Sequence, residues 1–196
     1  ARQLRIGYAK NYFDKIKDTS RSEWKVLRSF QDAGYTLIPI DFPDSAVYPF
    51  NIMDVVISAE AAAAFDEFTR NNVDDEMTRQ GKYDWPNSFR VSRLKSAVEY
   101  INANRHRYLL MQKVNDAMNS VDALICPTRG SGNQSAITNL TGHPAICVPT
   151  GFDNRQRLPT SITFLGRLYE EGKLFAVAEA YQQQTDWHRK HPEWLK

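Results

Sequence analysis

The sequence predicts an α/β fold in which a mixed β-sheet carries helices on both faces. Its first residues read as strand, helix and strand, at Leu4–Tyr8, Ser22–Ala33 and Tyr35–Ile40. A unit of about 40 residues in this order favours a parallel strand pair joined by a right-handed crossover. Further along, Ala145–Val148 is apolar without alternation, which is typical of a strand buried on both faces. Together these segments predict one sheet with helical connections.

The composition is that of an ordinary soluble globular protein. The 196 residues are enough for one core, with two small domains as the upper limit, and we expect a single domain over residues 1–196. A hydrophobic content of 42% and a charged content of 24% are average for this class. The net charge of +2, with both signs interspersed, predicts no nucleic-acid partner. No apolar run reaches the ~18 residues that a membrane span needs, so no membrane partner is expected.

The two cysteines and the first residue bear on the compartment and on the origin of the chain. Cys126 and Cys147 both lie in apolar strand candidates, and we interpret them as buried small side chains in a reducing compartment. This favours the cytoplasm. The chain opens with Ala1 and enters a strand at Leu4, so we expect it to be cut from a longer protein.

The first β-α-β unit carries recognisable boundary signals. Ser20 and Glu23 have the spacing of a capping box at the start of the helix. Gly34 is a typical C-terminal stop. Pro39 cannot donate to a ladder, so the second strand is predicted at a sheet edge or at a strand end.

Two helical regions are predicted in the middle of the chain. The first is Asn51–Arg70, with Asn51 as its cap. The polar stretch Asn71–Asn87 then reads as an irregular loop, either functional or poorly ordered. The second region, Phe89–Asn119, is one long helix or two joined ones. The apolar stripe expected on the first helix consists of Ile57, Ala61, Ala64, Phe65 and Phe68, and those on the second are Leu94, Val98 and Ile101, then Leu110, Val114, Ala117 and Val121.

The last third of the chain is expected to supply the centre of the sheet. Asp122–Cys126 reads as a buried strand, followed by the Gly/Ser loop Thr128–Ser135 at its carboxyl end, where ligands bind in open α/β sheets. Ala145–Val148 and Ser161–Leu165 are the next strands, joined by a hairpin or by another kind of crossover. Glu171–Thr185 is the last helix, and the tail after it is expected to dock on the fold.

Glycine and proline residues punctuate the strand Ala145–Val148. Pro144 and Pro149 bracket it, and because neither can donate to a ladder both are expected at strand ends. Gly142 and Gly151 supply positions where the backbone can turn with a positive φ. We therefore expect a tight entry into a central strand pair.

Motifs that carry catalysis or metal binding are missing from the chain. The segment around Ser131 does not match the G-x-S-x-G nucleophile turn, and neither phosphate-loop motif occurs. The four His residues have no Cys or carboxylate at ligand spacing, so no metal is expected. Arg105 and Arg107 interrupt the apolar face of their helix, either as solvated residues or as anchors for a carboxylate.

Several collinear segments resemble the amidase signature family. NLTGHPAICVPTGF, followed by LPTSITFLGRLYEEGKLFAVAEAY, resembles the C-terminal part of that family, and DALICPT resembles its strand ending in a Pro-Thr pair. The spacing of Tyr100, Ala103 and Arg107 resembles the preceding helix, and LRIGY resembles the strand that opens this half. The resemblance implies the fold of the C-terminal half of an amidase signature enzyme.

The same resemblance implies what the chain lacks. Family members use a Ser nucleophile, a second Ser in a cis peptide and a Lys base, in a Gly/Ser-rich segment that this sequence does not contain. We therefore expect a C-terminal portion of an amidase that lines the substrate pocket, without catalytic residues or a cofactor. The parent would hydrolyse carboxylic amides through an acyl-enzyme. The expected partners are the missing N-terminal catalytic half and a small-molecule amide, and we predict that this chain alone is inactive.

Four residues are predicted to contact substrate: Arg90, Thr128, Asn133 and Asn139. In glutamine-using family members an Asp and an Arg hold the charged ends of the substrate. The Asp position falls here near Gly132 and Asn133, and the Arg corresponds to Arg90. Since neither Gly132 nor Asn133 is acidic, a generic amidase parent is favoured over an enzyme that uses glutamine for charged tRNA.

An alternative function is a standalone α/β domain that binds a small molecule or a protein without catalysis. An exposed apolar sheet face would favour the amidase portion, because the missing half would cover it. Such a face could also make the chain a homo-oligomer. An evenly polar surface would favour the binding domain.

Overall fold

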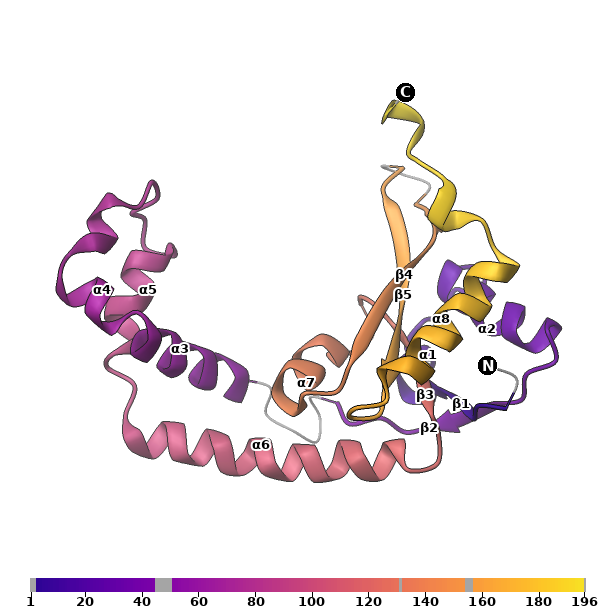
Figure 1. Ribbon diagram of the computed structural model, residues 1–196, viewed down its shortest axis with the longest axis horizontal. Coiled ribbons are helices and arrows are strands. Elements are labelled where there is room, and N and C mark those ends of the chain that lie inside the picture. The colour runs from indigo at the N-terminus through magenta and orange to yellow at the C-terminus, as the bar shows by residue number, and fades with distance from the viewer. Residues whose placement is uncertain (1–2, 45–50, 131, 154–156, 196) are drawn as a thin grey trace. The chain divides into compact units, whose positions relative to one another are not determined.

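The computed structural model describes residues 3–44, 51–130, 132–153 and 157–195, and its strands form one five-stranded mixed sheet (Figure 1). The order across the sheet is β2-β1-β3-β5-β4. β1 pairs in parallel with β2 and β3, whereas β5 pairs antiparallel with β3 and β4. The predicted α/β class with a mixed sheet is confirmed. The strands are β1 Ile6–Ala9, β2 Leu37–Ile40, β3 Ala123–Pro127, β4 Ala145–Phe152 and β5 Pro159–Gly166.

The described chain divides into two compact units, drawn from residues 1–47 with 110–196 and from residues 48–109. The first unit contains the sheet, and the second is helical. The helices are α1 Lys10–Phe13, α2 Ser22–Asp32, α3 Ile52–Ala64, α4 Asp66–Arg70, α5 Trp85–Ser92, α6 Ala97–Met118, α7 Gln134–Thr141 and α8 Glu171–Gln184, with short 3-10 turns η1 Val73–Glu76, η2 Trp187–Arg189 and η3 Glu193–Leu195.

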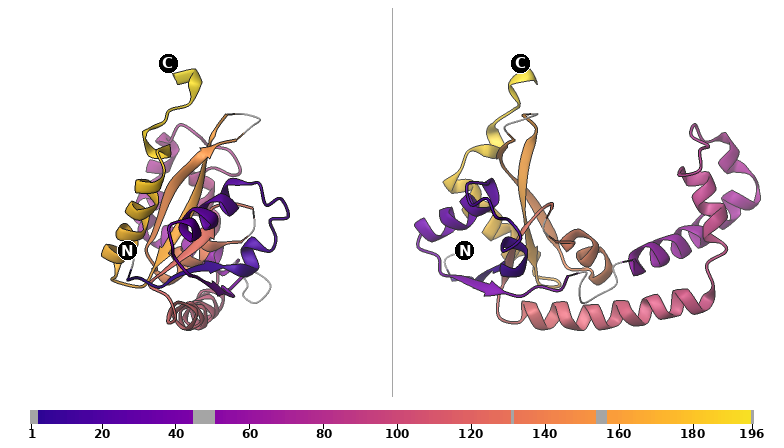
Figure 2. Two further views of the ribbon diagram at one scale, coloured as in Figure 1. Left: turned by 90° about the vertical axis from the view of Figure 1, so that its right-hand side faces the viewer. Right: turned by 180° about the vertical axis from the view of Figure 1, so that it is seen from behind.

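The core of the first unit lies between the sheet and helices α2 and α8. Phe30 of α2 and Tyr181 of α8 stack with their ring centroids 6.1 Å apart, and Phe164 of β5 meets both rings edge-on. The predicted buried face of α8, including Leu174 and Val177, is confirmed. Leu124, Cys126 and Leu165 point to the opposite side and are also buried. Figures 1 and 2 show α7 on that opposite side, so helices cover both faces as predicted.

The edge position predicted for β2 is confirmed, since β2 ends the sheet on one side and Pro39 lies within it. The β4–β5 connection is an antiparallel hairpin rather than a crossover, because the register runs from Ala145 opposite Leu165 to Phe152 opposite Pro159. A register shift between Pro149 and Gly151 interrupts that ladder. Gly142 and Gly151 both have the predicted positive φ, 79° and 136°, but Gly151 lies inside β4 at the register shift rather than in a turn.

The prediction that Ala145–Val148 is buried on both faces is wrong. β4 is the second edge strand of the sheet, while β5 takes the inner position, so the pair is not central. Ala145 and Cys147 are exposed, which also overturns the expected burial of Cys147. Pro149 lies inside the strand rather than at its end. An apolar run without alternation permits burial on both faces of a strand but does not require it. In the described chain nothing covers one face of β4.

Three local predictions about helices are also wrong. Ser20 donates to Asp18 Oδ1 at 2.6 Å, and Glu23 pairs with Arg21, so no capping box forms at α2. Asn51 makes no side-chain cap. Helix α7 lies where a Gly/Ser loop and a turn were expected, because its β-branched and Asn residues weaken the helical signal.

The region Phe89–Asn119, predicted as one long helix or two joined ones, consists of two helices, the end of α5 and α6. Its break has a cause in the sequence: Ser96 and Glu99 form a capping box at the start of α6. Ser96 N–H donates to the Glu99 carboxylate at 2.9 Å, and Glu99 N–H donates to Ser96 Oγ at 3.1 Å. The predicted loop Asn71–Asn87 contains η1 and the start of α5.

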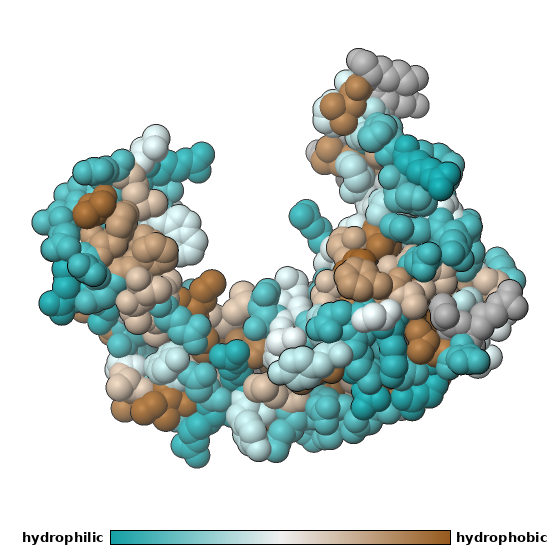
Figure 3. Space-filling view, viewed as in Figure 1, coloured by the Kyte–Doolittle hydropathy of each residue, from teal (hydrophilic) through white to brown (hydrophobic). Residues whose placement is uncertain are grey.

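Aromatic stacking holds this small unit together. Phe89 is buried and stacks on Phe65 with ring centroids 4.7 Å apart, and Trp85 also stacks on Phe89, at 5.5 Å. The predicted stripe on α3 is displaced, because Ile52, Val56 and Ala62 are buried while Ile57 is half exposed. Figure 3 shows apolar groups at the surface of α3 to α5. The large exposed apolar residues of this unit are Ile57, Phe65, Val73, Tyr83, Trp85, Val91, Leu94, Val98, Ile101, Tyr108 and Leu109.

Candidate substrate site

A cluster of hydroxyl groups marks the carboxyl end of β3. Thr128 follows the strand directly, and its Oγ1 lies 3.0 Å from Thr163 Oγ1 on the adjacent β5. The same oxygen is 3.8 Å from Cys147 Sγ on β4. Thr163 is buried, whereas Thr128 is partly exposed. The three strands therefore present one accessible hydroxyl, that of Thr128, which contacts the buried Thr163. It lies at the carboxyl end of a strand, where open α/β sheets bind ligands.

Gln134, which the sequence analysis did not single out, ties this cluster to α7. Its Nε2 donates to the carbonyl oxygen of Thr128 at 3.1 Å and lies 3.5 Å from Thr163 Oγ1. Gln134 is only 4% exposed, so these bonds fix the loop rather than a ligand. The signal that could have found it is its position in the first turn of a helix that follows a strand and a glycine loop. That signal was lost because α7 itself was not predicted.

Tyr12 of α1 shapes the loop between Thr128 and Gln134. Its hydroxyl donates to the carbonyl oxygen of Pro43 at 2.5 Å. Burial raises the pKa of Tyr12, so the phenol stays protonated. A Cβ at Gly132 would lie 2.0 Å from the ring, so only glycine fits there. The buried ring thus fixes the path of the loop next to Asn133.

The four predicted substrate residues do not form one cluster in the described structure. Thr128 and Asn133 belong to the same loop, in which Thr128 is partly exposed and Asn133 is exposed. Asn139 lies on the exposed side of α7, where its Nδ2 donates to the Ser135 carbonyl oxygen at 2.9 Å. Arg90 belongs to the second unit.

Arg90 already contacts two carboxylates within its own unit. Its Nη2 lies 2.5 Å from Asp74 Oδ2 and 2.6 Å from Asp75 Oδ1. Asp74 is fully buried, and its contact with Arg90 is an ion pair without hydrogen-bond geometry. A guanidinium in this position stabilises the fold of η1 and α5, because a buried carboxylate without a cation is costly.

His143 is the only histidine of the described chain that is buried, and it does not take the proton of Thr141. Its Nδ1 lies 2.9 Å from Thr141 Oγ1, while that hydroxyl donates its one proton to the Ile137 carbonyl oxygen at 2.9 Å. The imidazole must then donate from Nδ1, so it cannot accept the Thr141 proton. Burial lowers the pKa of His143, which keeps the ring neutral. The pair is a structural contact beneath the turn at Gly142.

The two thiols differ in environment. Cys126 is fully buried in β3, and burial raises its pKa, so its thiolate is not available for chemistry. Cys147 is exposed beside Thr128. Within the described residues, neither thiol has a histidine or lysine hydrogen-bonded to it, and no group of His, Cys, Asp and Glu could hold a metal.

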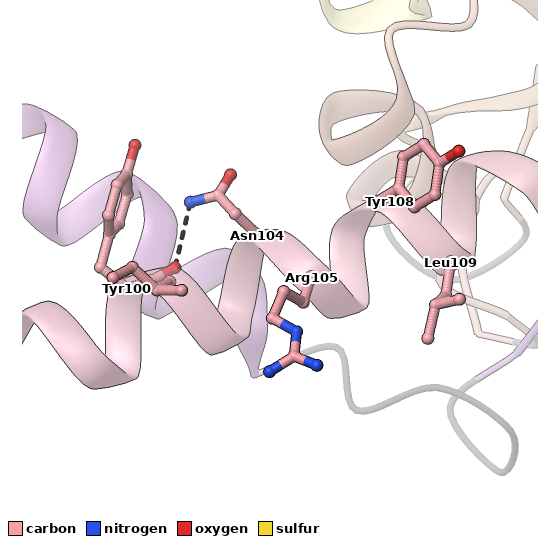
Figure 4. A pocket seen from close by; sticks show the side chains of 6 residues that line it. Tyr100, Asn104, Arg105, Tyr108 and Leu109 are labelled. Atoms are coloured by element: carbon pink, nitrogen blue, oxygen red, sulfur yellow. Dashed lines mark hydrogen bonds between the residues drawn. The ribbon is translucent and has the colours of Figure 1, made fainter.

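A second concave surface lies along α6 and lacks converging polar groups. Tyr100, Ile101, Asn104, Arg105, Tyr108 and Leu109 line an open depression of about 590 Å³ (Figure 4). Asn104 Nδ2 donates to the Tyr100 carbonyl oxygen at 3.1 Å, and the Arg105 side chain points away from Tyr100 and Tyr108. All six residues come from one helix, so the depression offers no enclosed site for a small molecule. No helix among the described residues is long and apolar enough to cross a membrane.

A comparison with known protein families identifies the class of protein. A family model described as Amidase matches residues 1–134, which is more than half of the chain. The chain therefore belongs to the amidase family. The resemblance to the amidase signature enzymes is confirmed, because solved structures with the same fold include such enzymes.

Curated relatives include the A subunits of glutamyl-tRNA(Gln) amidotransferases. The one from Rippkaea orientalis is 35% identical, in an alignment covering 47% of this chain and 23% of the relative. Its counterpart from Legionella pneumophila strain Corby is 33% identical with the same coverage. The match thus spans about a quarter of the length of these relatives.

Solved amidases match almost the whole chain. The peptide amidase of Stenotrophomonas maltophilia has a TM-score of 0.72 at 20% identity, covering 97% of this chain and 44% of that chain. A bacterial aryl acylamidase has a TM-score of 0.71 at 17% identity, covering 96% and 45%. 6-aminohexanoate cyclic dimer hydrolase has a TM-score of 0.73 at 14% identity, covering 98% and 47%. At these identities the likeness concerns the fold.

Proposed function

We propose that this chain is the C-terminal portion of an amidase that hydrolyses carboxylic amides through an acyl-enzyme. It would form part of the pocket for a small-molecule amide, while the nucleophile comes from polypeptide that the chain does not contain. The observation that carries the proposal is the unequal coverage: 97% of this chain matches 44% of a peptide amidase. Amide hydrolysis as the general reaction follows from membership of the amidase family.

The chemistry of the described groups supports a separation of roles, in which this chain binds the substrate and another segment carries the nucleophile and the base. Acyl transfer from an amide needs a nucleophile, a base that takes its proton, and an acid that protonates the leaving amine. Thr141 gives its proton to a backbone carbonyl, and Cys126 is buried with a raised pKa. The resemblance assigns the nucleophile and base to a Ser, a second Ser and a Lys on a Gly/Ser-rich segment. This chain would then bind and orient the substrate.

Thr128 and Asn133 are the residues that we place against the substrate. Thr163 and Gln134 hold Thr128 from behind, so its hydroxyl sits in a fixed position while remaining partly exposed. Asn133 offers an amide that can donate and accept, and it makes no cap bond to α7. Asn139 would shape the pocket from the next helix. Arg90 would have to exchange Asp75 for a substrate carboxylate.

Exposed apolar side chains favour this proposal over a standalone binding domain. Cys147 and Ala145 are exposed on β4, and most of the large exposed apolar side chains lie on the second unit. A self-contained domain would be expected to cover such groups. The two free thiols are in keeping with a reducing cytoplasm as the compartment.

The proposal is tested first with the purified 196-residue chain. We expect no release of aniline from a chromogenic anilide above a buffer blank, because the proposal places the nucleophile outside this chain. Turnover that grows with the concentration of this chain would contradict the proposal. The second arm is the longer polypeptide encoded by the same reading frame, which we expect to be active.

A matched pair of variants in the longer polypeptide tests the role of Thr128. Thr128→Ala should lower kcat/KM by about tenfold to a hundredfold, which corresponds to the ~1–3 kcal/mol of one hydrogen bond in a desolvated site. Thr36→Ala is the control, because Thr36 is exposed and lies just before the amino end of β2, whereas Thr128 follows the carboxyl end of β3. Equal kinetics for the two variants would remove Thr128 from the pocket.

A further inference from the structure

The hydrogen bonds that join Gln134, Thr163 and Thr128 have a fixed direction, which starts at the Gln134 amide. Gln134 faces the backbone carbonyl oxygen of Thr128, with its Nε2 at 3.1 Å. A carbonyl oxygen only accepts, so the amide must turn its nitrogen, and not its oxygen, towards the cluster. The same nitrogen lies 3.5 Å from Thr163 Oγ1. The Thr163 oxygen therefore accepts the second proton of the amide.

Thr163 must in turn donate its own proton to Thr128. The Thr163 side chain is only 4% exposed, and a buried hydroxyl proton without an acceptor is costly. Among the hydrogen bonds of the described residues, its oxygen contacts Gln134 Nε2 and Thr128 Oγ1. An amide nitrogen cannot accept, so the proton of Thr163 goes to Thr128 Oγ1, which lies 3.0 Å away. The donors follow one another from Gln134 to Thr163 to Thr128.

Thr128 is the last residue of this series, and its own proton is left for a group outside it. Gln134 and Thr163 are buried, whereas Thr128 is partly exposed. Cys147 Sγ lies 3.8 Å from Thr128 Oγ1, but a thiol sulfur is a weak acceptor. An oxygen atom of a ligand would be a stronger partner. Thr128 thus presents a hydrogen-bond donor to the candidate substrate site.

This direction decides which ligand groups fit beside Thr128. A carbonyl or carboxylate oxygen accepts the Thr128 proton and completes the series. An N–H group reaches only the remaining lone pair of the Thr128 oxygen, so the Thr128 proton loses its partner in a dehydrated pocket. A hydrocarbon group leaves the same proton without a partner. A buried donor that is left unsatisfied allows a polar site to reject close analogues of its substrate.

We propose that Gln134 and Thr163 make Thr128 a hydrogen-bond donor to the substrate, so that the pocket selects amides with an oxygen acceptor in addition to the scissile carbonyl. The inference rests on the proposed function and specifies its substrate class. The acceptor is a second oxygen because the scissile carbonyl must face the nucleophile, which the proposed function places outside this chain. Gln134 and Thr163 are positioning residues, since both act through Thr128.

The experiment uses matched amides and the longer polypeptide encoded by the reading frame of this chain. Anilides of valeric acid carry a keto, a methylene or an ammonium group at one position of the acyl part, and a second set of amides carries the same groups on the amine part. Chromatography of the products gives kcat/KM for each compound. In one of the two sets, kcat/KM for the keto compound should exceed that for the methylene compound by about tenfold to a hundredfold. The ammonium compound should be the poorest substrate.

Two variants of Thr128 test whether its hydroxyl is the donor. Thr128→Val keeps the shape of the side chain but removes the proton, so it should abolish the advantage of the keto compound. It should leave kcat/KM for the methylene compound within about threefold of the parent value. Thr128→Ser keeps the donor and should retain most of the advantage. An equal loss for all compounds would assign Thr128 to the fold or to the scissile carbonyl, and would overturn the inference.

Gln134→Glu tests the direction of the series. A carboxylate only accepts, so Thr163 would donate to Glu, Thr128 would donate to Thr163, and the Thr128 oxygen would offer only lone pairs to the substrate. The keto compound should lose its advantage, and kcat/KM for the ammonium compound should rise. Gln183→Glu adds the same charge at an exposed position on α8 and should behave like the parent. If Gln134→Glu does not fold, the two Thr128 variants still decide the question.

The outcomes separate this inference from the proposed function. Hydrolysis without a preference for the keto compound in either set overturns the inference and keeps the function. If the longer polypeptide hydrolyses none of the amides, the proposed function is overturned, and dissociation constants from calorimetry decide the inference. Tighter binding of a keto compound that Thr128→Val removes would keep Thr128 as the donor. Binding without that preference, or no binding at all, would overturn the inference as well.

Discussion

Asp122, at the start of β3, holds Arg5, at the start of β1, through both side chain and backbone. The Asp122 carboxylate accepts from Arg5 N–H at 2.9 Å, from Nε at 3.2 Å and from Nη2 at 3.1 Å. Asp122 N–H returns a bond to the Arg5 carbonyl oxygen at 2.7 Å. The two residues thereby set the register of the parallel β1–β3 pair, in which Ile6 faces Ala123.

Asp122→Asn should lower the free energy of unfolding at pH 7 by about 1–2 kcal/mol. The neutral amide keeps the shape but weakens charge-assisted bonds, and the half-exposed Arg5 limits the loss. Asp14→Asn is the control, because its ion pair with Lys10 is exposed on both sides and should contribute little to stability. Urea unfolding measures the free energy of unfolding of both variants. Equal losses in the two variants would show that the burial of Asp122 adds nothing to the stability of the fold.

The same pair predicts a dependence of stability on acid. The hydrogen bonds from Arg5 lower the pKa of Asp122 to about 2. The folded state therefore holds the proton less tightly than the unfolded chain, whose Asp pKa is about 3.9. The stabilisation is complete above that value and is lost as the pH falls towards 2. Asp122→Asn should remove this part of the acid dependence, so the unfolding energies of the two proteins should converge between pH 4 and pH 2.

The burial of His143 predicts a second pH range in which stability changes, closer to neutral pH. Burial lowers its pKa, so the unfolded chain takes up a proton at a pH where the folded chain remains neutral. Stability should be complete above the unfolded pKa of about 6.5 and should fall as the pH drops below it. His143→Asn should lose less stability than the parent between pH 7.5 and 5.5. His106→Asn, at an exposed position, should behave like the parent.

Gly132→Ala should destabilise the first unit by about 2–3 kcal/mol, because the added methyl group meets the buried Tyr12 ring and the loop must shift. Gly172→Ala is the matched control. Nothing lies within 4 Å of a Cβ at Gly172, and alanine favours the first turn of α8, so this variant should be neutral or slightly stabilising. Thermal unfolding of both variants checks the difference. A Gly132→Ala protein as stable as the control would show that the loop gives way without cost.

Gln134→Leu should cost about 1–2 kcal/mol, since the Thr128 carbonyl oxygen and Thr163 lose their shared donor while leucine keeps the volume. Gln183→Leu, at an exposed position on α8, is the control. The pair is compared by denaturant unfolding of the 196-residue chain. In the longer polypeptide that we propose to be active, Gln134→Leu should also raise KM, because Thr128 would no longer be held in place.

The parts of the fold that sequence reasoning predicted are those where local signals and packing agree. The β-α-β start and α8 combine apolar periodicity with a clear partner surface, and both are confirmed. The two Ser-x-x-Glu patterns show where such signals stop being sufficient. Ser96 and Glu99 form a capping box. Glu23 has the same spacing from Ser20 but forms an ion pair with Arg21 instead. The competition from a nearby cation is visible only in the folded structure.

The candidate site was predicted in part. The carboxyl end of β3 followed from the rule for open sheets, and Thr128 lies there. Gln134 was not predicted, because its role depends on a short helix of weak propensity and on a strand that comes later in the chain. Burial of Cys147 was predicted from an apolar run, yet the position of β4 in the sheet decides its exposure. Sheet order is a property of the whole chain and cannot be read from one strand.

The register that Arg5 and Asp122 set also has a kinetic consequence. The two residues are 117 positions apart, so pairing β1 with β3 closes a long loop at an entropic cost of about 4 kcal/mol. The β4–β5 hairpin and its contact with β3 need only short closures. We therefore expect the C-terminal strands to assemble early and the N-terminal β-α-β unit to join them last. Folding of this sheet would then begin from strands in the C-terminal part of this chain rather than from its N-terminal β-α-β unit.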